Sequence, residues 1–145
     1  MGSLAILAAR LALSFVLAAC GEEDAEPPTA APVSRLGESF SLRVGEAIRV
    51  EDAEVTVTFT EVASDSRCPK DVTCIQAGEA VVHLAVVSET GENAVLKLEV
   101  PPGGSSLVAS FQAFRITIFE LNPQKESGKP IDPATYVATV RVNRA

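Results

Sequence analysis

The densest cluster of polar side chains after residue 34 lies between residues 65 and 74, where charged residues stand beside two cysteines. Arg67 can pair with Asp65, Asp71 or Glu79, and the same carboxylates can offer oxygen ligands to Ca²⁺. Pro69 fixes its own φ angle and stiffens the segment. The segment is either a stapled crossover between two strands with a structural role only, which we favour, or a rigid, exposed recognition loop. The candidate recognition residues are Asp65, Arg67, Lys70 and Asp71.

Other chemistries find little support in the sequence. Zinc and copper sites need several His, Cys or Met ligands, whereas the chain has one His, at position 83, and one Met, at position 1. His83 lies in an alternating strand pattern, which is typical of a partly exposed structural side chain. No Gly-x-Ser-x-Gly motif is present, and the spacing of Cys68 and Cys74 is not the Cys-x-x-Cys of redox enzymes. We therefore expect no catalytic residues, no cofactor and no zinc or copper site, and we consider an enzyme the least supported class.

The N-terminal segment indicates membrane attachment. An apolar run over residues 4–19 ends in a Leu-Ala-Ala-Cys motif at residues 17–20, followed by Gly21. Its uncharged part, residues 11–17, is too short to span a bilayer as a permanent helix. The motif resembles the lipobox of bacterial lipoproteins. The alternatives are an ordinary signal peptide, or a transmembrane start, with a chance cysteine.

The lipobox resemblance implies how the protein is processed. In that family the signal is cut before the cysteine, whose sulfur carries a diacylglyceryl group and whose new amine is acylated. The resemblance implies a signal peptide at residues 1–19, lipidation of Cys20 and a membrane as one partner. Gly21, where Asp would favour inner-membrane retention, suggests the outer membrane of the cell envelope, on its periplasmic or its surface face. The acidic residues within 22–26 are interpreted as a solvated spacer, with a surface-export signal as the alternative.

The two remaining cysteines and the net charge indicate further properties of the chain after the signal segment. With Cys20 lipidated, Cys68 and Cys74 form a pair in an oxidising compartment, and we expect a disulfide that contributes roughly 2–2.5 kcal/mol. The net charge of −7 argues against nucleic-acid binding. Residues 20–34 are rich in Pro and acids and predict a disordered or extended stalk. Residues 35–145 are enough for one core, so we expect a single domain there.

Alternating apolar residues predict strands along the whole domain. In residues 54–62, for example, Val55, Val57 and Phe59 share one face and threonines share the other. The sequence predicts an all-β fold, an antiparallel β-sandwich of about seven strands with an immunoglobulin-like arrangement as one form of it, or alternatively a small β-barrel. Both domain cysteines lie in one loop and no Trp is present, so an antibody-type inter-sheet bridge is not expected. The predicted strands cover residues 39–44, 47–50, 54–62, 80–87, 94–100, 111–121 and 136–142.

The segment around the cysteines carries a second resemblance. Asp-Ser-Arg-Cys-Pro at residues 65–69, Cys74, and Ala-Gly-Glu-Ala at residues 77–80 are similar to a motif of uncharacterised bacterial secreted proteins and lipoproteins. Residues 131–136, Ile-Asp-Pro-Ala-Thr-Tyr, fit the same set, so the resemblance spans most of the domain. Gln76 departs from that set, in which a Trp often stands at this position. The set carries no agreed activity.

Three functions remain as hypotheses. The first is a non-catalytic, lipid-anchored module that contacts an envelope protein through residues 65–74, with the loop at 122–135 nearby. The second is a protease inhibitor that uses Arg67 as its anchor side chain. The third is a lipoprotein that binds a metal or small ligand, such as Ca²⁺ at Asp65, Asp71 and Glu79. We expect a monomer, because no apolar edge strand is free of charges.

Overall fold

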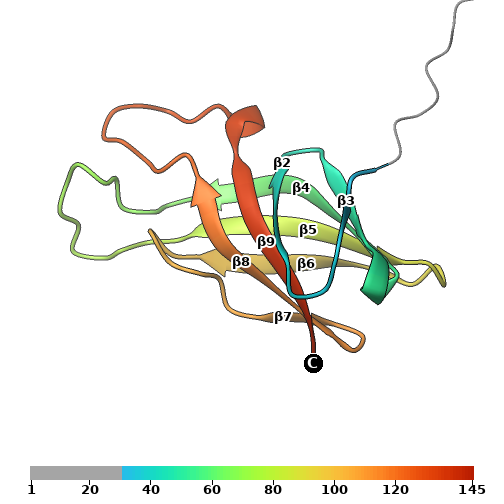
Figure 1. Cartoon of the computed structure of the whole chain (residues 1–145). Helices are drawn as coiled ribbons and strands as arrows, with labels where there is room; N and C mark the ends of the chain where they lie inside the picture. The colour runs from blue at the N-terminus through green and yellow to red at the C-terminus, as the bar shows by residue number, and fades with distance from the viewer. Residues whose placement is uncertain (1–30) are drawn as a thin grey trace, which may run out of the picture.

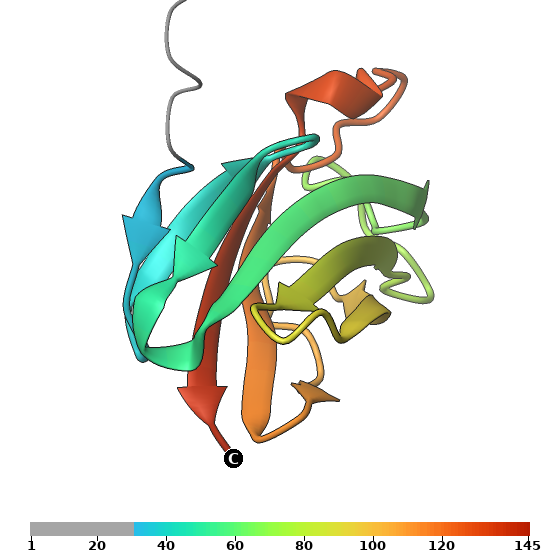
Figure 2. The same cartoon turned by 90° about the vertical axis from the view of Figure 1, so that its right-hand side faces the viewer.

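The computed structural model describes residues 31–145 as two stacked β-sheets (Figures 1 and 2). The predicted β-sandwich is confirmed, and because neither sheet closes on itself the barrel alternative is wrong. The predicted signal peptide, Cys20 and the stalk as far as residue 30 lie outside the described residues. Between residues 31 and 145, no helix has the length and apolar character needed to cross a membrane.

The first sheet has five strands in the order β1-β3-β4-β5-β6. β1 runs parallel to β3, and every other pair in this sheet is antiparallel. Val55, Val57 and Phe59 of β4 are fully buried, while the threonines between them point outward, as the alternation predicts. The bounds are β1 (Val33–Ser34), β3 (Ala47–Val50), β4 (Val55–Asp65), β5 (Ala80–Ser88) and β6 (Asn93–Val100), with the 3₁₀ turn η1 (Glu51–Ala53) before β4.

The second sheet has four antiparallel strands in the order β2-β9-β8-β7. Its inner face carries Ile116, Ile118 and Val140, which are fully buried against the first sheet. The predicted inward positions of residues 80–87, 111–121 and 136–142 therefore meet in one core. The bounds are β2 (Ser39–Arg43), β7 (Ala109–Phe111), β8 (Phe114–Asn122) and β9 (Val137–Arg144), with the 3₁₀ turn η2 (Pro133–Thr135) before β9.

The strand order corrects the immunoglobulin-like arrangement. In immunoglobulin domains, consecutive strands are exchanged between the sheets by Greek-key connections. Here β3 to β6 follow one another in a single sheet, and β7 to β9 do so in the other. The turn that joins β5 to β6 forms the predicted hairpin, and such local connections favour pairing of successive strands.

Strand number and bounds also differ from the prediction. The described residues form nine strands instead of seven, because the two-residue β1 and the three-residue β7 are too short to show alternation. The stalk does not extend to residue 34, since Val33 and Ser34 pair with β3. β4 continues to Asp65 instead of ending at residue 62, because bulges after Phe59 and Val62 shift its register and interrupt the alternation.

Candidate functional site

Two long loops meet at the same end of the sandwich (Figure 1). The stapled loop, residues 66–79, joins β4 to β5, and the proline loop, residues 123–136, joins β8 to β9. The backbone N–H of Lys70 donates to the carbonyl of Lys125 at 3.0 Å, and the N–H of Ser127 donates to Oδ1 of Asp71 at 2.8 Å. An ion pair of 2.7 Å between Lys70 and Glu126 adds a third link. Each loop therefore braces the other.

A disulfide closes the stapled loop. Cys68 and Cys74 are bonded, with Cα atoms 6.0 Å apart. The expected pairing of these two cysteines is therefore present. The ring lies at the outer part of the loop, where it restricts the conformations open to residues 69–73.

The base of the stapled loop is fixed by a buried arginine. The Arg67 side chain is 1% exposed, and its guanidinium donates to the Asp65 carboxylate twice, from Nε at 2.9 Å and from Nη2 at 2.7 Å. Nη1 donates to the carbonyl of Leu121 at 2.7 Å, and Nη2 also donates to the carbonyl of Pro123 at 2.9 Å. This planar, bidentate donor set connects the end of β4 with the end of β8 and the start of the proline loop.

The Asp65 carboxylate is the centre of this arrangement. Its side chain is 8% exposed, and besides the guanidinium it accepts hydrogen bonds from the Arg67 backbone N–H at 3.1 Å and from the Tyr136 hydroxyl at 2.8 Å. Burial by itself raises the pKa of Asp65, but the hydrogen bonds from Arg67 and Tyr136 outweigh it and hold the pKa below its ordinary value. Burial, followed by the bond to Asp65, raises the pKa of Tyr136 to about 12. We call Asp65, Arg67 and Tyr136 the buried triad.

The buried triad changes the interpretation of two candidate residues. Asp65 and Arg67 were expected on an exposed recognition surface, and this expectation is wrong, because both side chains lie inside the domain and satisfy one another. Arg67 cannot serve as the anchor side chain of an inhibitor, since it does not reach solvent. Lys70 and Asp71 do lie at the surface, where they contact the proline loop.

The remaining motif residues close the stapled loop onto itself. Ser66 and Glu79 exchange backbone and side-chain hydrogen bonds, and the Cys68 N–H donates to the Ala77 carbonyl at 2.7 Å. Gly78 has φ +64° and lies so close to Ser66 that an added Cβ would stand 1.9 Å from the Ser66 carbonyl oxygen. Only glycine fits this position without a backbone shift. The motif at residues 65–80 thus has a direct structural explanation.

The proline loop is ordered by its own capping residue. Asp132 Oδ1 accepts from the Ala134 N–H at 3.0 Å, and the Thr135 hydroxyl donates to the Asp132 carbonyl at 2.7 Å. This Asp-Pro-Ala-Thr turn places Tyr136 directly before β9, where its hydroxyl reaches Asp65. The sequence grouped residues 131–136 with the stapled loop only by resemblance, and the contact that links them was not anticipated.

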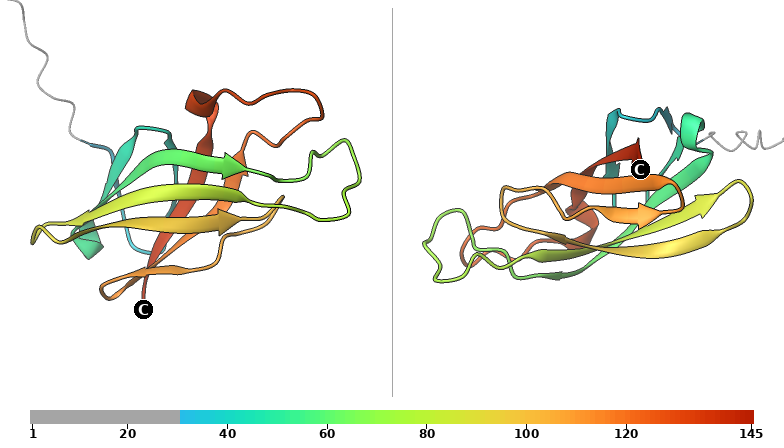
Figure 3. Two further views of the ribbon diagram at one scale, coloured as in Figure 1. Left: turned by 180° about the vertical axis from the view of Figure 1, so that it is seen from behind. Right: turned by 90° about the horizontal axis from the view of Figure 1, so that it is seen from below.

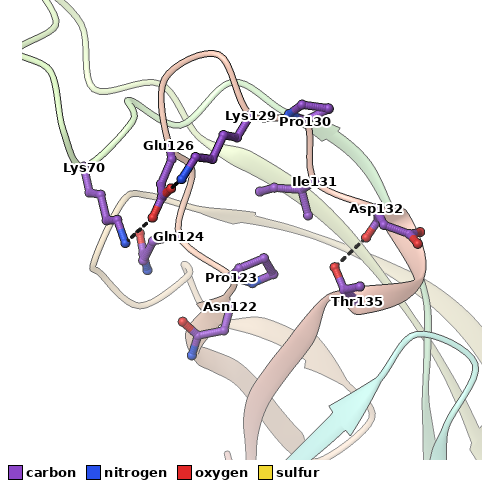
Figure 4. A pocket seen from close by; sticks show the side chains of 10 residues that line it. All are labelled: Lys70, Asn122, Pro123, Gln124, Glu126, Lys129, Pro130, Ile131, Asp132 and Thr135. Atoms are coloured by element: carbon purple, nitrogen blue, oxygen red, sulfur yellow. Dashed lines mark hydrogen bonds and ion pairs between the residues drawn. The ribbon is translucent and has the colours of Figure 1, made fainter.

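An open groove of about 540 Å³ lies along the proline loop, where Asn122 at the end of β8 and Lys70 of the stapled loop complete its lining (Figure 4). Pro123 and Ile131 contribute apolar surface, and Asp132 lines the same groove. Glu126 stands between Lys129 and Lys70. The hydrogen bond from Lys129 has the largest effect and that from Lys70 the next, and together they lower the pKa of Glu126 to about 2. The groove therefore combines an apolar patch with charges of both signs.

The stapled loop also presents apolar side chains to solvent. Ile75 is fully exposed and Val72 is 45% exposed. Both belong to a loop whose base is fixed by the buried triad and whose outer part is closed by the disulfide. Isolated exposed apolar residues are common, but two on one rigid loop form a feature that a protein partner can use. The sequence prediction missed these residues because it considered only the charged positions.

The described residues do not form a cluster of metal ligands. Between residues 31 and 145, no three His, Cys, Asp or Glu side chains gather as metal ligands, so Asp65, Asp71 and Glu79 do not come together around an ion. His83 pairs with Glu61 at 3.0 Å on the outer face of the first sheet.

The fold and this site define a β-sandwich domain with a disulfide-stapled, internally braced loop surface at one end. Comparisons with known protein families, curated proteins and solved structures give no match for the chain.

Proposed function

We propose that the protein is a lipid-anchored, non-catalytic module of the cell envelope that binds a partner protein through the stapled loop and the adjoining proline loop. The observation that carries the proposal is the exposure of Val72 and Ile75 on a loop fixed by a disulfide and by the buried triad. A preorganised loop loses little conformational entropy on association, so its apolar contacts are retained as binding free energy. Lys70 and Asp71 stand beside this apolar pair and supply the polar rim of the interface.

The anchor rests on the Leu-Ala-Ala-Cys motif at residues 17–20. Acyl chains on Cys20 hold the domain at the membrane, and Gly21 favours the outer membrane. Feeding cells an alkyne analogue of palmitate tests this part: the full chain is labelled, and a Cys20→Ser variant is not. Equal labelling of wild type and variant, or labelling of neither, contradicts the lipid anchor. Such a result has no bearing on the proposed binding surface, which is tested separately.

A cross-linking capture experiment tests the binding surface. The full chain with Val72→Ser and Ile75→Ser is compared with wild type in the cell envelope, and the matched control carries Leu107→Ser and Val108→Ser, which are also exposed apolar residues but lie before β7. We expect one cross-linked partner that wild type and control capture and the loop variant loses.

Two further outcomes of this experiment are informative. A Cys68→Ser/Cys74→Ser variant that stays folded by circular dichroism is expected to capture less partner, because its loop is no longer closed. Capture by all variants alike would place the binding site elsewhere, and capture by none would contradict a protein partner.

The groove supports a second candidate, binding of a small organic ligand. It offers apolar surface at Pro123 and Ile131 together with charged groups at Lys129 and Asp132. A thermal-shift screen of envelope metabolites against the full chain tests it, with Ile131→Ala as the variant. A stabilising compound that shifts wild type and the variant equally does not bind in the groove.

A further inference from the structure

The two sheets end in four edge strands, and β6 is by far the longest of them. β1, β2 and β7 have two, five and three residues, whereas β6 has eight. Within the described residues, the backbone of β6 forms ladder bonds with β5 on one side and no backbone bond on the other. Short edges offer little to a pairing strand, but a long edge presents a row of free N–H and C=O groups.

β6 also lacks two of the features that block edge pairing, proline and bulges. It contains no Pro, and its register with β5 runs without a shift from Val87↔Asn93 to Ala80↔Val100. Bulges and prolines are common ways of preventing an edge from accepting another strand. The view from below in Figure 3 shows β6 along the border of the sandwich, beside the short β7.

The charges on β6 favour pairing with a second copy of the same strand. Lys97 and Glu99 lie on the same outward face, with side chains 60% and 41% exposed. If a second β6 pairs antiparallel about a two-fold axis at Leu98, Lys97 stands opposite Glu99 of the second copy, and the axis repeats the pair. A two-fold axis at residue 97 or 99 instead places like charges opposite one another. The strand is therefore complementary to itself in this register.

The inner face of β6 agrees with the same register. Leu98 stands opposite Leu98 of the second copy, and the half-buried Leu96 stands opposite Val100. Apolar side chains then meet across the new strand pair on the inward side, as ion pairs do on the outward side.

We propose that two copies of the chain associate through antiparallel pairing of their β6 strands, joining the two five-stranded sheets into one. In this register residues 96–100 pair, and Pro101 and Pro102 of the second copy stand opposite Val95 and Ala94 and end the pairing. A strand pair this short buries less surface than a standard interface, so the dimer is weak and concentration-dependent. The charges that led us to expect a monomer act in this arrangement as complementary pairs. This inference is independent of the proposed binding surface, which lies on the loops.

Sedimentation velocity of the full chain in density-matched detergent, over a series of protein concentrations, tests the dimer. Lys97→Glu and Glu99→Lys each place like charges across the two-fold axis, and we expect each to raise the dimer Kd by about tenfold. The charge-swapped chain, Lys97→Glu with Glu99→Lys, restores both pairs and is expected to dimerise like wild type. Mixing the two single variants is expected to give a heterodimer.

Lys129→Glu, which makes the same charge change in the proline loop, serves as the matched control. It is expected to leave the Kd unchanged, and circular dichroism of each variant confirms that it is folded. A monomer at every concentration, or a dimer that none of the β6 charge changes weakens, overturns the proposal.

Discussion

The carboxylate of Asp65 accepts a hydrogen bond from the hydroxyl of Tyr136, 71 residues later in the chain, at 2.8 Å. The same carboxylate binds the guanidinium of Arg67, which is two residues away. One buried acid thus joins the stapled loop to the proline loop. The surface proposed to bind a partner depends on this interior contact.

Removal of Arg67 is expected to destabilise the domain strongly. Arg67→Met leaves the buried Asp65 carboxylate without its cation and the carbonyls of Leu121 and Pro123 without a donor, which costs roughly 3–5 kcal/mol. Urea unfolding measures the change, and Lys70→Met, at the surface of the same loop, is expected to cost less than about 1 kcal/mol. Equal losses for the two variants would contradict the role given to the buried triad.

The sole tyrosine of the chain reports on the buried triad directly. Because burial and the bond to Asp65 raise the pKa of Tyr136 to about 12, its phenolate should form well above the ordinary value of about 10. Ultraviolet absorbance follows the titration, and urea-unfolded protein gives the reference. The contribution of Tyr136 to the free energy of unfolding is fully present below its pKa in the unfolded state. It is lost as the pH rises through its pKa in the folded state. A folded-state midpoint near 10 would show that the hydroxyl is not held by Asp65.

Acid should weaken the domain through Asp65. Its pKa is lower in the folded state than the unfolded value of about 3.9, so its contribution is complete above that pH and is lost as the pH falls through the folded pKa. Asp65→Asn should therefore flatten the fall in stability below about pH 4. Glu126 also has a lowered pKa, so both proteins are compared in a Glu126→Gln background. An unchanged slope would contradict the assignment.

Gly78 is expected to tolerate no side chain. Gly78→Ala directs a methyl group at the Ser66 carbonyl and places alanine at a positive φ, which together cost more than the roughly 1 kcal/mol of the positive φ alone. Gly91 is the matched control, since its φ is also positive. Apart from its two chain neighbours, no residue has an atom within 4 Å of a methyl group added at Gly91. Thermal unfolding of Gly78→Ala and Gly91→Ala separates the two causes, and equal melting temperatures would show that the close approach is relaxed at little cost.

Strand identity and inward faces could be predicted because they depend on local periodicity. Alternation along β4, β5, β8 and β9 predicted which side chains fill the core, and the structure confirms it. Alternation fails where a strand is very short or bulged, so β1 and β7 were missed and the end of β4 was placed too early.

The candidate site was only partly predictable. The sequence placed Asp65, Arg67, Lys70 and Asp71 in one polar segment and indicated the pairing of Cys68 with Cys74, but it could not assign burial within that segment. A charged residue is normally exposed, and Arg67 is an exception only because three acceptors, two of them from a distant part of the chain, surround it.

The sequence by itself determined an all-β chain, the faces of its longer strands and a lipobox-like motif at Cys20, because each of these is a local pattern. Only the tertiary structure decided the strand order, the burial of Asp65 and Arg67, and the contact of Asp65 with Tyr136. These depend on which strands lie side by side, and that choice is made by the packing of the whole core and by hydrogen bonds between residues far apart in the chain.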